Sequence, residues 1–92
     1  VNVNGVDEFK DITLISVYPN PTDAYLNLTI ENQVIESLYF MLIDITGRQV
    51  LNQSISQSNT LIDLKTLQAG NYLLTVYNEK QTLKSFSIIK NN

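Results

Sequence analysis

Short runs in which apolar and polar residues alternate recur along the chain from residue 12 onward. In residues 24–30 two sets alternate: Ala24, Leu26, Leu28 and Ile30 against Tyr25, Asn27 and Thr29. A period of two places the two sets on opposite faces of a β-strand, one toward a core and the other toward water. No segment longer than a turn shows the period of a helix. The pattern predicts an all-β chain.

Seven such runs are rich in β-branched and aromatic residues and are bounded by turn-forming residues. They are residues 13–18, 24–30, 37–45, 48–55, 60–64, 71–77 and 82–89. One-sided alternation favours two packed antiparallel sheets. Gly70 precedes Tyr72 by two residues, which is typical of the tyrosine corner of immunoglobulin-like sandwiches. We therefore expect an immunoglobulin-like antiparallel β-sandwich of about seven strands, with an open barrel as the alternative.

The change of pattern along the sequence suggests one domain that follows a short leader. Residues 1–11 show little period and are interpreted as a leader or linker joined to something upstream, and residues 12–92 as the domain. Because the sequence begins with Val1 and not with Met, we expect its natural N-terminus to lie upstream. The longest apolar stretch, residues 38–43, is far shorter than the roughly 20 residues of a membrane-spanning helix. Membrane insertion is not expected.

The composition lacks the residue types on which most catalytic sites depend. The chain has no histidine and no cysteine, the usual sources of a general base, a thiol nucleophile or a zinc site. We expect no enzymatic activity, no metal and no cofactor. The net charge of -3 offers no cationic surface, so nucleic acid is not an expected partner. Asp23, Asp44 and Asp63 each fall at a predicted turn or strand end, where they are expected to cap backbone donors.

Both prolines of the chain flank a single asparagine. Pro19 and Pro21 lie between the first two predicted strands and are expected to hold an extended, kinked connection whose missing donors cost nothing. Asn20 is expected to bond to the backbone of its neighbours and so to set the turn. The pattern leaves a structural role and a recognition role equally open.

The last predicted strand alternates Phe86 and Ile88 with Ser85, Ser87 and Ile89, between Lys84 and Lys90. Flanking lysines discourage aggregation at a sheet edge. The same edge is also able to pair with a partner strand, or with a second copy in a dimer. Both interpretations stay open.

Aromatic side chains provide another candidate surface. Tyr25 and either Tyr39 or Phe40 face outward in the pattern and, together with Tyr77, would make a platform for sugar rings. Cross-strand aromatic pairing or core burial is the more ordinary explanation.

Four motifs together resemble a known family. In order they are V-Y-P-N-P-T, D-I-T-G-R, L-Q-A-G-N-Y-L-L-T-V and K-S-F-S-I-I-K. The D-I-T-G-R segment supplies Asp and Gly to a tight hairpin. Over residues 12–90 the chain resembles the C-terminal sorting domain, type A, of the type IX, or Por, secretion system of Gram-negative bacteria.

The resemblance implies a sorting signal for an upstream passenger. It implies recognition of the folded domain by the type IX translocon, removal by a sortase-like cysteine peptidase at the outer membrane, and passage through the periplasm to the cell surface or medium. The implied recognition positions are Pro19, Asn20, Pro21, Asp44, Gly47, Gly70, Lys84, Phe86, Ile88, Ile89 and Lys90.

Two further positions follow from the resemblance, and two others depart from it. Tyr72 is the implied structural corner and Gly5 marks the implied cleavage region. Asn91 and Asn92 depart from the family by extending past the closing lysine. An immunoglobulin-like carbohydrate-binding or adhesive module of a surface enzyme is the alternative function, and a passive spacer is a third interpretation.

Overall fold

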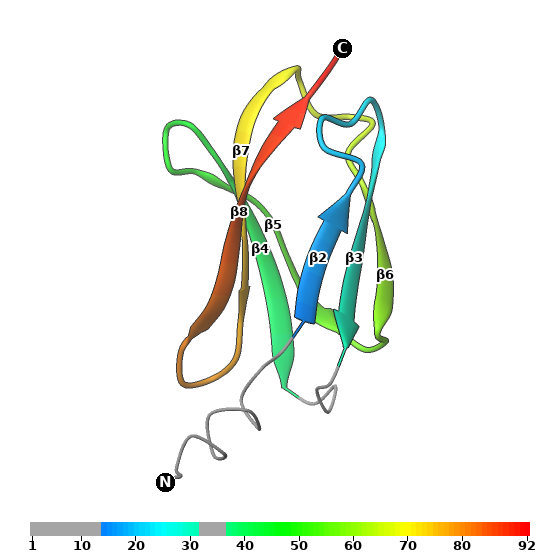
Figure 1. Ribbon diagram of the computed structural model, residues 1–92. Coiled ribbons are helices and arrows are strands. Elements are labelled where there is room, and N and C mark those ends of the chain that lie inside the picture. Colours follow the sequence, from blue (N-terminus) through cyan, green and yellow to red (C-terminus); the bar gives the residue numbers. More distant parts are fainter. Residues whose placement is uncertain (1–13, 32–36) are drawn as a thin grey trace, which may run out of the picture.

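Seven β-strands are present in the part of the chain that this computed structural model describes, residues 14–31 and 37–92 (Figure 1). They are β2 (Leu14–Tyr18), β3 (Tyr25–Glu31), β4 (Leu38–Asp44), β5 (Gln49–Ile55), β6 (Asn59–Asp63), β7 (Gly70–Tyr77) and β8 (Thr82–Lys90). Each of these bounds lies within one residue of the predicted strand. Thr13 and Gly5 lie outside the described residues. The all-β prediction is confirmed.

The strands form two antiparallel sheets that pack face to face. One sheet has the order β2-β3-β6 and the other the order β5-β4-β7-β8, and Figure 1 shows them as two layers. β2, β3 and β6 correspond to strands A, B and E of an immunoglobulin-like sandwich, which share one sheet. β4, β7 and β8 correspond to strands C, F and G, which share the other. β5 pairs with β4, whereas the fourth strand of the constant-type immunoglobulin domain lies in the other sheet.

The core lies between the sheets and is built from the inward set of each alternating run. Leu26, Leu28 and Ile30 of β3 are at most 2% exposed, as the sequence pattern predicts. The remaining buried apolar side chains are Ile15, Leu38, Phe40, Leu42, Ile55, Ile62, Leu64, Leu74, Val76 and Ile88. Both sheets contribute to this cluster, so each sheet needs the other to bury its apolar inner face away from water.

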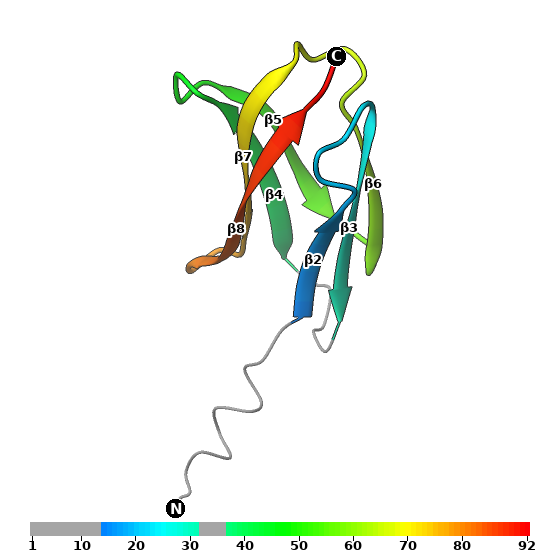
Figure 2. The same ribbon diagram turned by 45° about the horizontal axis from the view of Figure 1, so that its top comes forward.

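Two views of the molecule show how its ends differ (Figures 1 and 2). The β2–β3 turn, the β4–β5 turn, the start of β7 and the C-terminus lie toward one end. Leu14, where the described chain begins, lies at the other end of β2, on the same side as the β7–β8 hairpin. Among the described residues, no helix is long and apolar enough to span a membrane.

Candidate recognition surface

The proline turn contacts the closing strand through Asn20. Its side-chain Nδ2 donates to the carbonyl oxygen of Ser87 at 2.7 Å, and its Oδ1 accepts from the backbone N–H of Ile89 at 3.0 Å. The peptide bonds before Pro19 and Pro21 are both cis. The expectation that Asn20 bonds to its neighbours' backbone is corrected, because these bonds reach β8 at the far end of the sequence.

Thr22 extends this contact with its backbone. Its N–H donates to the carbonyl of Ile89 at 2.9 Å, and its carbonyl accepts from the N–H of Asn91 at 2.7 Å, which makes a parallel bridge to Lys90. The side chain of Thr22 is 2% exposed and its hydroxyl donates to the carbonyl of Tyr25. Sequence reasoning did not single out Thr22. The only available signal was its position directly after the second proline.

The two lysines of β8 differ in their exposure, because Lys84 is exposed and Lys90 is buried. Lys84, Ile88 and Lys90 have the same parity along β8 and point toward the space between the sheets. Lys90 is only 5% exposed, and Lys84 Nζ donates to the carbonyl of Ile15 on β2 at 3.3 Å. The interpretation as an exposed edge charge is therefore wrong for Lys90, whereas Lys84 stays exposed although its Nζ reaches across to β2. Lys84 joins the two sheets, and its Nζ lies 5.2 Å from the ring centroid of Phe86.

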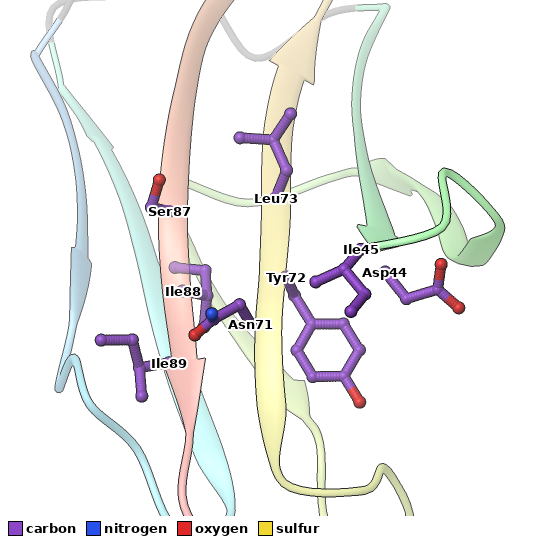
Figure 3. A pocket seen from close by; sticks show the side chains of 8 residues that line it. All are labelled: Asp44, Ile45, Asn71, Tyr72, Leu73, Ser87, Ile88 and Ile89. Carbon is purple, nitrogen blue, oxygen red and sulfur yellow. The ribbon is translucent and has the colours of Figure 1, made fainter.

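Apolar side chains are accessible where the opposite face of β8 meets β7 and the β4–β5 turn. Ile89 is 46% exposed, Leu73 on the neighbouring β7 is 37% exposed, and Ile45 in the β4–β5 turn is 80% exposed. These side chains line one shallow groove together with Ser87 and Tyr72 (Figure 3). In Figure 3 Ile45 lies beside the Tyr72 ring. Sequence reasoning missed Ile45, whose signal was an isoleucine inside a turn.

Asp44 organises the turn at one side of this groove. Its Oδ1 accepts from the backbone N–H groups of Thr46 and Arg48 at 2.9 and 3.0 Å, and from the Thr46 hydroxyl at 2.6 Å. The Thr46 hydroxyl is the largest influence that holds the Asp44 pKa below its ordinary value of 3.8. Gly47 has φ of 89°, a conformation that favours glycine, and its N–H donates to the Asp44 carbonyl at 2.9 Å to close the turn. Asp44 therefore caps the turn, as expected from the sequence.

Tyr72 fixes the connection that leads into β7. Its hydroxyl donates to the carbonyl of Gln68, four residues upstream, at 2.7 Å, the geometry of a tyrosine corner. Gly70 begins β7 and lines a hollow next to the groove, together with Asp44 and Tyr72.

Several of the positions implied by the resemblance meet at one end of the sandwich. Asn20 forms hydrogen bonds with Ser87 and Ile89, the two neighbours of Ile88. Ile88 and Ile89 line the groove together with Asp44. Lys84 lies farther along β8 and faces β2 instead. Asp63 caps its own turn by accepting from the N–H of Lys65 at 2.9 Å. In residues 14–31 and 37–92, no three acidic side chains gather in a way that would hold a metal ion.

The aromatic residues do not make one platform. Phe40 is 1% exposed and belongs to the core. Tyr39 and Tyr77 stack on each other with ring centroids 5.4 Å apart. Tyr25 lies on the other sheet, where the Nζ of Lys65 is 5.3 Å from its ring centroid.

These features define a class of protein: an immunoglobulin-like β-sandwich in which a proline turn and an edge strand are joined into one exposed surface. More specifically, the chain belongs to the family of secretion system C-terminal sorting domains, whose sequence model matches residues 16–90. It is a non-catalytic C-terminal sorting signal for type IX secretion. A signal of this kind implies that the protein is exported out of the cell toward the surface. A search of curated proteins found no match.

Proposed function

We propose that the type IX translocon recognises this domain in its folded state, at the end where the proline turn meets the C-terminal half of β8. The observation that carries the proposal is the pair of hydrogen bonds from Asn20 to Ser87 and Ile89. Two segments separated by more than sixty residues of sequence thereby form a single surface. Such a surface exists only when the sandwich is folded.

The chemistry of this surface suits a docking role. Ile45, Leu73 and Ile89 expose apolar area around a groove whose floor is regular sheet, and their backbones are held by turns and ladders. Apolar area that stays exposed in a folded domain is a common mark of a protein interaction site. A rigid backbone also lowers the entropy lost on binding.

The place where a passenger would be attached also supports recognition at this end of the sandwich. A passenger would precede Leu14, which lies at the opposite end of β2 from the proline turn (Figure 1). The point of attachment is therefore at the end of the sandwich away from the groove. One translocon surface can then serve many unrelated cargo proteins.

The remaining steps of the proposal follow the resemblance of the sequence. The host is a Gram-negative bacterium, the domain is of type A, and a sortase-like cysteine peptidase removes it by cutting in the leader around Gly5. The passenger is then released or joined to anionic lipopolysaccharide at the cell surface. The mass of the mature passenger's C-terminal peptide would test the position of the cut.

The function is tested by fusing residues 1–92 to a fluorescent protein that carries a signal peptide. In a strain with a working type IX translocon we expect the fusion protein to leave the periplasm, and in a matched strain without the translocon to stay there. The reporter without residues 1–92 should stay in both strains. Periplasmic retention of a well-folded fusion protein in the competent strain would contradict the proposal and direct attention to a glycan-binding screen.

A further inference from the structure

The side-chain amide of Asn20 makes the two hydrogen bonds that a residue of a neighbouring parallel strand would make. In a parallel pair, a residue donates its N–H to the residue before its partner and accepts from the residue after it. Asn20 does this around Ile88, because Nδ2 donates to Ser87 and Oδ1 accepts from Ile89. The amide therefore occupies the position in the ladder opposite Ile88.

The backbone of Thr22 occupies the next position in the same register. It donates to Ile89 and accepts from Asn91, and so pairs in parallel with Lys90. Ile88 and Lys90 are two residues apart, as are Asn20 and Thr22. The turn thus supplies two consecutive rungs of a parallel strand. They cover, from Ser87 to Asn91, the side of β8 that has no neighbour among the described strands.

The sequence of the turn explains why a side chain is needed for the first rung. Proline has no N–H, so the backbone of Pro19, Asn20 and Pro21 carries a single donor. An asparagine side chain carries both a donor and an acceptor on one short, planar group. Aspartate would keep only acceptors and alanine would keep neither, whereas glutamine has both at the end of a longer chain.

We propose that Asn20 is a positioning residue of the sorting signal, which acts through β8 and does not itself contact the translocon. This inference rests on the proposed function. The two bonds of Asn20 hold the residues whose side chains line the groove, Ser87 and Ile89. An edge strand is held by a sheet partner on one side only, so it opens locally unless its other side is bonded. Asn20 keeps the end of β8 in one register for recognition.

The test measures this opening directly. Three variants are made, Asn20→Gln, Asn20→Ala and Asn20→Asp, with Asn27→Ala as the control. Asn27 is matched because its Nδ2 also donates to a backbone carbonyl, that of Tyr18 at 3.2 Å, in the other sheet. Hydrogen exchange of the Ile89 amide should be about tenfold faster in the alanine variant, which removes its acceptor, as expected for the loss of a hydrogen bond of ordinary strength. Exchange should also be faster in the aspartate variant, because its second carboxylate oxygen cannot donate to the Ser87 carbonyl and repels it. The Leu74 amide and the Asn27→Ala variant should show no such change.

Export is then measured for the same variants fused to the reporter. We expect export to be highest for the wild type, lower for glutamine and lowest for alanine and aspartate, in step with the exchange rate of the Ile89 amide. A residue that touched the translocon directly would lower export without this correlation. The Asn27→Ala fusion protein should be exported as the wild type is.

Each other outcome has a definite meaning. If the wild-type fusion protein is not exported, the proposed function fails. The exchange data still report whether the two hydrogen bonds of Asn20 hold the end of β8. Normal export with fast exchange at Ile89 overturns the positioning role. Lost export with unchanged exchange also overturns it and makes Asn20 a contact residue. If all three Asn20 variants unfold while Asn27→Ala folds, Asn20 is a folding residue and the inference is wrong.

Discussion

Asn20 and Asp44 show the same chemistry at two turns, because each uses a side-chain oxygen to accept backbone N–H groups. The partners of Asp44 lie two and four residues away, whereas those of Asn20 lie 67 and 69 residues away. Rules for turn residues describe local partners. They therefore predicted the role of Asp44 and gave the wrong partners for Asn20.

At the residue scale, the lowered pKa of Asp44 predicts a pH dependence. A carboxylate whose pKa is lower in the folded state stabilises that state above its unfolded pKa, and the contribution is lost as the pH falls through the folded pKa. We expect Asp44→Asn to lower the free energy of unfolding at neutral pH, slightly because the turn is exposed. The difference from wild type should shrink as the pH falls below 3.8.

Urea unfolding of both proteins over this range measures the difference. The other carboxylates are common to both proteins, so their titration cancels in the comparison. A difference between the two proteins that stays constant down to the lowest pH would contradict the role given to the Asp44 carboxylate.

At the scale of elements, the local sequence pattern was sufficient to predict all seven described strands. Most strands have one buried and one accessible face, as β3 and β4 show, so the period of two appears in the sequence itself. In β5 the alternation is weak, and its β-branched and apolar residues between two turns carried the prediction. The pairing order and the contact between the proline turn and β8 have no such local signature, because they depend on segments that are distant in sequence. Lys90 shows the limit clearly, since a terminal lysine was expected at a solvated edge and is instead buried.

Two adjacent residues of β8 test this alternation. Ile88 is 0% exposed and Ile89 is 46% exposed, so the same substitution should have different effects. Ile88→Val should lower the free energy of unfolding by about 1 kcal/mol, because a buried methylene group is lost. Ile89→Val should change it by less than about 0.5 kcal/mol. Denaturant unfolding of both variants gives the comparison, and equal effects would mean that the register of β8 is different in solution.

At the scale of the whole molecule, the sandwich separates attachment from recognition. The described chain begins at one end, and the proline turn, the Asp44 turn and the C-terminal half of β8 meet at the other (Figure 2). The core that joins the sheets fixes these segments relative to each other. Deleting β8 would remove Ile88 from this core and would confuse loss of folding with loss of recognition. A surface substitution avoids the problem.

The most direct test is export of the reporter fusion protein with Ile89→Glu, compared with the fusion protein that carries Leu61→Glu. Both side chains are exposed, at 46% and 62%, and both substitutions add one negative charge to an outer sheet face. Only Ile89 lines the groove. With both fusion proteins shown to fold, we predict that Ile89→Glu is retained in the periplasm and that Leu61→Glu is exported. Equal export of the two would contradict recognition at the end where the proline turn meets β8.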